Sequence, residues 1–166
     1  MGPQMPFRVG RYDATSANPE NRLPNVHDTV DNIVARFLDM DARLDHIMVS
    51  ALLGAHSTGK QRHTDLDRVG FPLDSTPDEW DILYYSQAMQ DVQEPGTARL
   101  PVDYTFGHDP KTKPIYRFYS VNEDDWNKDF VAAMNIVADL GVTHTLQVCP
   151  IIPSSTNPFS FGMKEV

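Results

Sequence analysis

Apolar residues recur at helical spacing in three separate stretches, and this periodicity constrains the fold more than any other feature. Spacing at i, i+3, i+4 and i+7 gives a helix one apolar face, which packs against another element. The first stretch begins near Asp28, a candidate N-cap; the second covers residues 44–55; the third runs from about Asn122 to Gly141. The apolar positions are Val30, Ile33, Val34, Phe37 and Leu38, then Leu44, Ile47, Met48, Ala51, Leu52 and Ala55, then Trp126, Phe130, Ala133, Val137 and Leu140. The chain is therefore predicted to be mainly α, with minimal β structure.

The segments between these stretches are rich in turn-forming residues. With 13 prolines in 166 residues, the chain is predicted to contain long ordered loops, including residues 1–25 and 60–78. A short helix is expected from about Asp78 to Gln90. Residues 91–120 have a mixed pattern, and residues 150–166 are expected to be an extended loop. Because no repeat or internal boundary stands out, residues 1–166 are expected to form a single domain.

The charge balance excludes several classes of function. Aspartate and glutamate number 23 and lysine and arginine 14, so the formal net charge is −9. This charge disfavours binding to nucleic acid or to an anionic membrane, because both require cationic surfaces. No apolar run approaches the ~20 residues that span a bilayer. The single cysteine, Cys149, excludes an intrachain disulfide. With no signal-peptide pattern and no Asn-x-Ser/Thr sequon, an intracellular location is expected, and secretion is the alternative.

His56 is the first candidate for chemistry, because it follows the apolar face of the second predicted helix. One interpretation is a core histidine or a cation at the end of a helix. In the other, a ring nitrogen binds a metal or haem iron. That role requires a partner for the second ring nitrogen, usually a carboxylate.

A second candidate is the segment 71–81, in which Asp74, Thr76 and Asp81 place oxygens around a turn. Such an array suits calcium, which takes 6–8 oxygen ligands. The alternative is a helix start, with Ser75 or Thr76 as the cap and Pro77 in the first turn. Spacing alone does not decide between the two.

Taken together, these motifs resemble the proximal half of the secreted fungal haem peroxidases, the group of lignin and manganese peroxidases. The similar segments follow one another in order: Gly10-Arg11-Tyr12-Asp13-Ala14-Thr15, Leu23-Pro24 to Phe37, Leu52-Leu53-Gly54-Ala55-His56-Ser57, Pro72-Leu73-Asp74-Ser75-Thr76-Pro77, Arg99 to Asp103 as a strand-like stretch, and Trp126 to Pro153. The resemblance covers nearly the whole chain.

The resemblance implies a role for each matching residue. His56 would be the axial ligand of haem b, and Asp103 would accept the hydrogen bond from its other ring nitrogen. The segment that runs past the haem propionates would carry Lys60, Arg62 and His63, whose positive charge suits that place. Leu73 would lie near the axial ligand. The proximal calcium site would comprise Ser57, Asp74, Thr76, Glu79 through its backbone oxygen, and Asp81.

The chain also departs from the family pattern. The family's amino-terminal half, with its distal arginine, distal histidine and distal calcium, has no counterpart here. Ala51 stands where some members carry a redox tryptophan, Arg62 replaces the manganese-binding aspartate, and Leu73 replaces an aromatic residue. Ordinary peroxidase turnover is therefore expected to be weak, because distal acid–base catalysis contributes about 10²–10⁴-fold.

These features lead to the hypothesis of a shortened, haem-binding oxidoreductase acting on a small-molecule substrate. A substitute proton shuttle would come from His27, His46, His63, His108 or His144. A homodimer is expected to cover apolar faces that a lone half-fold leaves open, at residues 30–38 and 44–55. The alternatives are a haem-free fold that binds a small molecule or catalyses a non-redox step, and a non-enzymatic interaction subunit.

Overall fold

The computed structural model describes residues 2–20, 22–142 and 144–149, and within them the fold is mainly α, as predicted. The helices are α1 (Val30–Leu38), α2 (His46–Leu53), α3 (Leu83–Ala88), α4 (Pro101–His108), α5 (Lys113–Tyr119) and α6 (Glu123–Asp139), with 3₁₀ helices η1 (Gly54–Thr58) and η2 (Leu66–Arg68). Two short antiparallel strands, β1 (Arg8–Val9) and β2 (Gln147–Val148), pair Arg8 with Val148. The predicted tail loop, residues 150–166, lies outside the described residues.

The first two predicted helices form, but their ends differ from the prediction. Thr29 caps α1 by accepting a hydrogen bond from the Asn32 amide. Asp28 is not the cap, because its carboxylate instead accepts from the Asn25 amide in the preceding turn. The second helix begins at His46, after the cap Asp45, and the chain tightens into η1 at Gly54, so residues 44–55 are not one continuous α-helix.

Helices α3, α4 and α5 differ most from the sequence prediction. The helix expected over residues 78–90 is confined to α3, because residues 78–82 form turns before Leu83. The mixed region 91–120 contains α4 and α5, separated by a turn that begins at Asp109. The expected strand-like stretch is also wrong: Pro101 occupies the first turn of α4, where its missing N–H has no cost.

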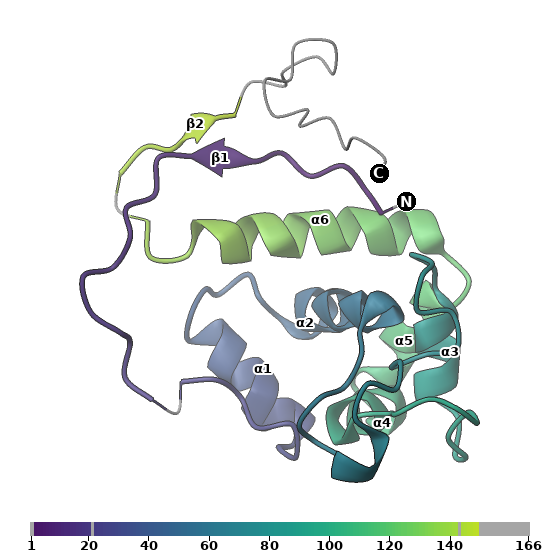
Figure 1. Cartoon of the computed structure of the whole chain (residues 1–166). Coiled ribbons are helices and arrows are strands. Elements are labelled where there is room, and N and C mark those ends of the chain that lie inside the picture. Colours follow the sequence, from purple (N-terminus) through teal and green to yellow (C-terminus); the bar gives the residue numbers. More distant parts are fainter. Residues whose placement is uncertain (1, 21, 143, 150–166) are drawn as a thin grey trace, which may run out of the picture.

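Helix α6 closes the fold and matches its prediction, with Trp126, Phe130 and Ala133 buried. It ends before Gly141, whose φ of 73° lies in the left-handed region that glycine adopts without strain. Figure 1 shows α6 lying across the other helices, with β1 and β2 on its far side. The core beneath it is unusually aromatic and includes Tyr84, Tyr85, Phe106, Tyr116, Tyr119 and Trp126.

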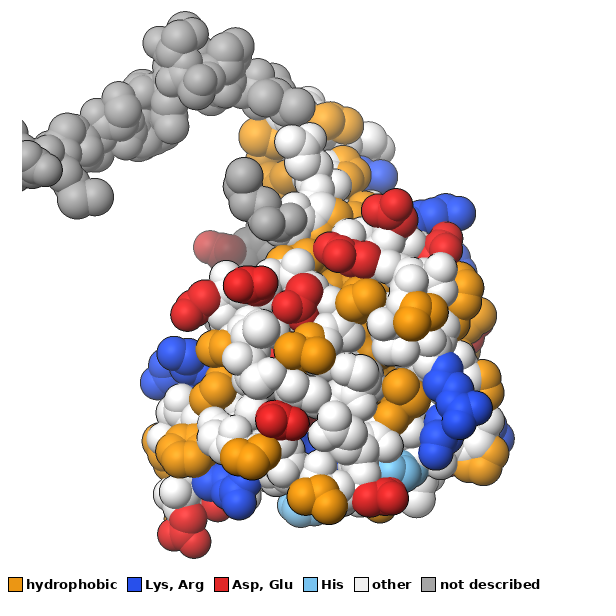
Figure 2. Space-filling view, turned by 90° about the vertical axis from the view of Figure 1, so that its right-hand side faces the viewer, with side chains coloured by type: hydrophobic (Ala, Val, Ile, Leu, Met, Phe, Trp, Pro, Cys, Tyr) orange, Lys and Arg blue, Asp and Glu red, His pale blue; other side chains and the backbone are white. Residues whose placement is uncertain are grey.

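The surface carries mixed charges. On the face seen in Figure 2, acidic, basic and hydrophobic side chains are interspersed, and the described residues form no continuous basic patch there. None of the helices in the described part of the chain is long and apolar enough to cross a membrane.

Candidate functional site: a buried histidine–aspartate pair

His56 lies on η1, which follows α2 directly, and two core aromatic side chains form hydrogen bonds to the last turn of α2. The Trp126 indole donates to the Ala51 carbonyl at 3.1 Å, and the Tyr85 hydroxyl donates to the Ser50 carbonyl at 3.0 Å. A Cβ on Gly54 would stand 2.4 Å from both Trp126 Nε1 and Tyr85 Oη. Only glycine fits at this position, so the chain can tighten from α2 into η1 in close contact with α6.

Asp103 approaches His56 from α4, 47 residues along the chain. The His56 Nδ1 atom lies 2.8 Å from Asp103 Oδ1. Asp103 stands at the third position of α4, where its Oδ2 atom accepts from the Leu100 amide at 3.1 Å, as in a capping box. The Asp103 side chain is 1% exposed and that of His56 is 26% exposed, so the carboxylate is buried while the imidazole keeps some contact with water.

The electrostatics of this pair favour a charged or strongly polarised imidazole. Burial alone would lower the pKa of His56, but the charge of Asp103 and its hydrogen bond outweigh burial and raise that pKa. An ionised carboxylate only accepts, so His56 Nδ1 carries the proton. In the neutral imidazole the lone pair is then on Nε2, for which the described residues supply no hydrogen bond.

Sequence reasoning missed two tyrosines that extend this pair into the core. The Tyr84 hydroxyl donates to Asp103 Oδ1 at 2.9 Å and lies 2.9 Å from the Tyr116 hydroxyl. Burial and the nearby Asp103 charge raise the pKa of both phenols well above its usual value, so both remain donors. In the sequence, a buried tyrosine on a short helix has the same pattern as any core aromatic residue, so no signal marked these hydroxyls.

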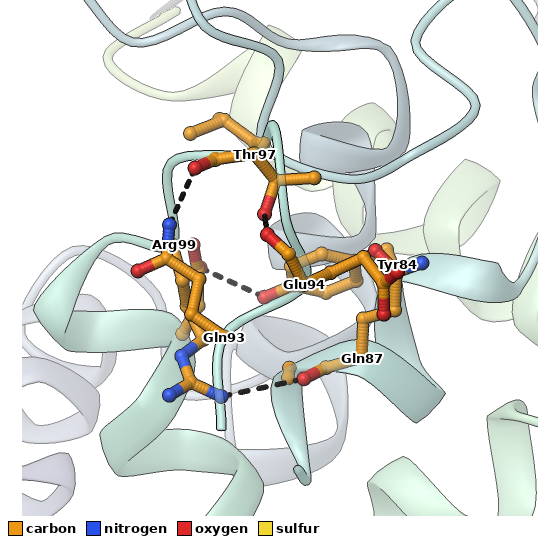
Figure 3. Close-up of a pocket in the computed structure, with 9 residues that line it drawn as sticks. Tyr84, Gln87, Gln93, Glu94, Thr97 and Arg99 are labelled. Atoms are coloured by element: carbon orange, nitrogen blue, oxygen red, sulfur yellow. Dashed lines mark hydrogen bonds between the residues drawn. The ribbon is translucent and has the colours of Figure 1, made fainter. Parts of the chain in front are cut away.

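A small cavity adjoins this network. Its lining includes Tyr84, Arg99 and Asp103, and its volume is about 10 Å³, which is enough for one water molecule. Figure 3 shows Arg99 reaching the Gln87 carbonyl, and Thr97 bound to the Glu94 carbonyl. A cavity of this size cannot hold an organic substrate.

The predicted calcium ligands lie in a turn rather than at a helix start, because α3 begins only at Leu83. The Asp74 Oδ1 atom accepts from the Thr76 amide at 3.0 Å, and the Thr76 hydroxyl donates to Asp81 Oδ2 at 2.9 Å. The Glu79 amide donates to the Thr76 carbonyl at 2.9 Å, and its side chain is exposed. The structure therefore brings four of the five predicted ligands into one turn.

Two buried oxygens near this part of the fold have no hydrogen-bond partner among the described residues: Asp74 Oδ2 and Ser57 Oγ. Burial, and to a smaller extent the charge of Asp81, raise the pKa of Asp74 to about 6. No hydrogen bond joins Ser57 to the turn. Within the described ranges, no group of three or more histidine, cysteine, aspartate or glutamate side chains is arranged to hold a metal ion.

The other predicted site residues follow η1. Lys60, Arg62 and His63 have exposed side chains. Leu73 is buried, and its Cδ1 atom would lie 2.8 Å from a Cβ on Gly59, so it packs closely behind the His56 turn. The structure thus places Leu73 beside the His56 segment and leaves the three cationic or titratable side chains in solvent.

Among the histidines predicted as proton shuttles, three make contacts away from His56. His46 Nε2 lies 3.9 Å from Asp31, His108 Nδ1 lies 2.8 Å from the Tyr104 carbonyl, and His144 Nε2 lies 2.6 Å from the Gly10 carbonyl. His27 and His63 are exposed.

Comparison with known proteins gives a consistent relationship. A family model described as peroxidase matches residues 1–122. The chain is 29% identical to Ligninase H2 of Phanerodontia chrysosporium, over 96% of this chain and 47% of that protein. It is 30% identical to manganese peroxidase 3 of Phlebia radiata, over 84% and 42%, and 31% identical to the cytosolic L-ascorbate peroxidase 2 of Arabidopsis thaliana, over 84% and 54%. The chain spans about half the length of the curated relatives it matches.

These relatives overturn the expected intracellular location. That expectation came from the missing signal-peptide pattern, the cysteine content and the absence of a sequon. The relatives include several fungal ligninases and a manganese peroxidase, the group that the sequence resemblance identified as secreted. Because the chain matches only about half the length of such proteins, the features missing from its sequence do not indicate an intracellular location.

Proposed function

Because the chain belongs to the peroxidase family, we propose that it is a haem-binding oxidoreductase in which His56 is the axial ligand. The observation that carries this proposal is the 2.8 Å contact between His56 Nδ1 and the buried carboxylate of Asp103. A histidine that ligates a metal through one ring nitrogen usually donates a hydrogen bond from the other. The donor set therefore fits haem iron.

In this arrangement Asp103 holds the imidazole in a single tautomer and a single orientation. It also raises the basicity of the ring, so that His56 is a stronger ligand. The hydrogen bond from the Trp126 indole to the Ala51 carbonyl holds the end of α2, from which the His56 turn follows. When bound, haem would supply the redox chemistry with peroxide, and the chain's residues would bind it and adjust its electronic properties.

The absorption spectrum of the chain titrated with haem b tests this proposal. We expect the wild-type chain and His27→Ala to give the same Soret band, and His56→Ala to lose it or bind much more weakly. His27 is a matched control because it is an exposed histidine outside the buried network. An unchanged spectrum in His56→Ala would overturn the axial assignment. Absence of a Soret band in the wild-type chain would favour a haem-free fold that binds a small molecule, or an interaction subunit.

We further propose that Lys60, Arg62 and His63 face the haem propionates and that Leu73 packs near the axial ligand. All three polar residues are exposed on the segment that follows η1, and Leu73 lies behind the turn at Gly59. Cationic side chains stabilise carboxylates at such positions. Replacing Lys60 and Arg62 with glutamine should weaken haem binding without changing the position of the Soret band.

We propose calcium as a second ligand, held by Ser57, Asp74, Thr76, Asp81 and the backbone oxygen of Glu79. Its support is the pair of buried oxygens without hydrogen-bond partners and the raised pKa of Asp74. An uncompensated buried carboxylate takes up either a proton or a cation. Calcium would also join η1 to the turn that follows it.

Thermal unfolding with and without a chelator tests the calcium proposal. Binding to the folded state alone stabilises it by about 2.7 kcal/mol at a hundredfold excess over Kd. Chelator should therefore lower the Tm of the wild-type chain and of Asp78→Ala, an exposed aspartate in the same turn, but not that of an Asp74→Ala/Asp81→Ala variant. If the wild-type Tm does not respond to chelator, the calcium assignment is wrong.

We propose that the chain forms a homodimer. Most of the two faces expected to be open are buried within the chain, including Val30, Val34, Leu44 and Val49. Leu38 and Ile47 stay 41% and 44% exposed and would lie at the interface. Light scattering tests this point, because a mass that stays near 18.7 kDa at all concentrations would exclude a dimer.

A further inference from the structure

Asp103 is surrounded by more donors than its pairing with His56 requires. Its Oδ1 atom accepts from both His56 Nδ1 and the Tyr84 hydroxyl, at 2.8 Å and 2.9 Å, and its Oδ2 atom accepts from the Leu100 amide at 3.1 Å. The two donors on Oδ1 come from different elements, η1 and α3. They share one oxygen and therefore compete for its charge.

The number of available protons fixes which group donates and which accepts at each hydrogen bond of this network. Tyr84 has one hydroxyl proton, and Asp103 can only accept, so that proton is directed to Oδ1. The contact between Tyr84 and Tyr116 must then use the Tyr116 proton. Tyr116 donates to Tyr84, and Tyr84 donates to Asp103. Hydrogen bonds arranged in such a chain polarise one another, so Tyr116 strengthens the donation from Tyr84.

We propose that Tyr84, supported by Tyr116, is a positioning residue that limits how strongly Asp103 accepts the hydrogen bond from His56. The hydroxyl withdraws negative charge from the same oxygen that faces the imidazole. It also fixes the position of Oδ1, which accepts from both donors. This inference rests on the proposed function, since it concerns how basic the axial ligand is.

The core contains a matched control for this role. Tyr85 neighbours Tyr84 in the sequence and is equally buried, and their ring centroids lie 5.1 Å apart. Its hydroxyl donates to the Ser50 carbonyl, not to Asp103. Tyr84→Phe and Tyr85→Phe each remove one buried hydroxyl from the same cluster. Only the first removes a donor from Asp103.

The first measurement is the NMR signal of the His56 Nδ1 proton in the haem-free chain. In Tyr84→Phe, Asp103 Oδ1 has His56 as its remaining side-chain donor, so the bond should shorten and the proton should move downfield. Tyr116→Phe should shift it in the same direction by a smaller amount, because Tyr84 still donates. Tyr85→Phe should leave it close to its wild-type position. An equal shift in Tyr84→Phe and Tyr85→Phe would overturn the proposal.

The second measurement is the reduction potential of the haem-loaded chain. A more anionic imidazole stabilises ferric iron, so Tyr84→Phe should have a more negative potential than wild type, and Tyr85→Phe should not. If Tyr84→Phe does not fold, Tyr116→Phe decides the question, because it keeps Tyr84 in place. If the wild-type chain binds no haem, the proposed function fails, and the proton shift in the haem-free chain still decides the role of Tyr84.

Discussion

Two buried aspartates follow the histidine segment in the sequence, and their surroundings are opposite. Asp103 is 1% exposed, and its two oxygens accept from His56, Tyr84 and the Leu100 amide. Asp74 is 0% exposed, yet its Oδ2 atom has no hydrogen-bond partner among the described residues. The described part of the chain supplies three donors to one carboxylate and only the Thr76 amide to the other.

This difference separates two ways of using a buried carboxylate. Asp103 is held by fixed donors, so it orients another group. Asp74 is poorly compensated, and burial raises its pKa to about 6, so it favours a proton or a cation from solution. Equal burial therefore does not imply an equal role, and substitutions at the two positions should have different consequences.

The largest expected effect is that of Asp103→Ala. It leaves His56, Tyr84 and the Leu100 amide without their acceptor in the core. Removing one partner of a buried charged pair costs about 3–5 kcal/mol. Urea unfolding should therefore show a large loss of stability. Asp109→Ala, at the opposite end of α4, removes only a local bond to the Lys111 amide and should cost about 1 kcal/mol or less.

Substitutions of Gly54 and Gly59, which lie on either side of His56 in the sequence, should have the next largest effect on stability. Gly54→Ala brings a methyl group within 2.4 Å of the Trp126 ring nitrogen and the Tyr85 hydroxyl oxygen, and both side chains are buried and cannot move freely. Overpacking of this kind costs roughly 1–3 kcal/mol. Gly59→Ala meets the flexible end of Leu73 at 2.8 Å and should cost less. Chemical denaturation of the two variants compares them directly, and equal losses would contradict a rigid contact at Gly54.

When chelator is present, Asp74→Asn should raise the free energy of unfolding, whereas Asp103→Asn should lower it. At pH 7.5 the wild-type Asp74 is ionised and its Oδ2 atom has no donor among the described residues. Two pKa units correspond to roughly 3 kcal/mol, so the amide should stabilise the fold by up to that amount. The folded pKa is raised, so this cost is fully present above about pH 6 and is lost by about pH 4. The advantage of Asn should therefore shrink as the pH falls. Adding calcium should reverse the order.

The smallest effect should come from a surface aspartate. The side-chain hydrogen bond from Arg43, followed by its backbone amide, lowers the pKa of Asp41 to about 2. A depressed pKa contributes stability above about pH 4 that is lost as the pH falls towards 2. The Arg43 side chain is 68% exposed, so solvent screens the pair. Arg43→Ala should slightly raise the pH of the acid-unfolding midpoint at low salt, and the difference should vanish at high salt.

The long amphipathic elements could be predicted from the sequence, and the short ones could not. Helices α1 and α6 follow from a clear apolar face, with Val30, Ile33 and Val34 or Trp126, Phe130 and Ala133 buried. Helices α3, α4 and α5 have six to eight residues each, and packing rather than periodicity determines them. The tightening of α2 into η1 at Gly54 depends on contacts with rings from α3 and α6, which no local pattern records.

In the candidate site, too, some features could be predicted from the sequence and others depend on how the helices pack. Spacing alone left His56 with two interpretations, and the pairing with Asp103 came from the family resemblance. The donation from Tyr84 depends on where α3 and α4 meet. That contact joins residues 19 positions apart, and no local pattern records it.

The order in which the chain is made has a consequence for the contact between Trp126 and Ala51. This hydrogen bond joins residues 75 positions apart, whereas the contact between His56 and Asp103 joins residues 47 positions apart. The aspartate is therefore translated before the tryptophan, and synthesis at about 5–20 residues per second puts roughly one to five seconds between them. During that interval the nascent chain already holds the histidine and its carboxylate but not α6, the helix that packs on α2. The histidine and its carboxylate are therefore available for pairing before the hydrogen bond that holds the end of α2 can form.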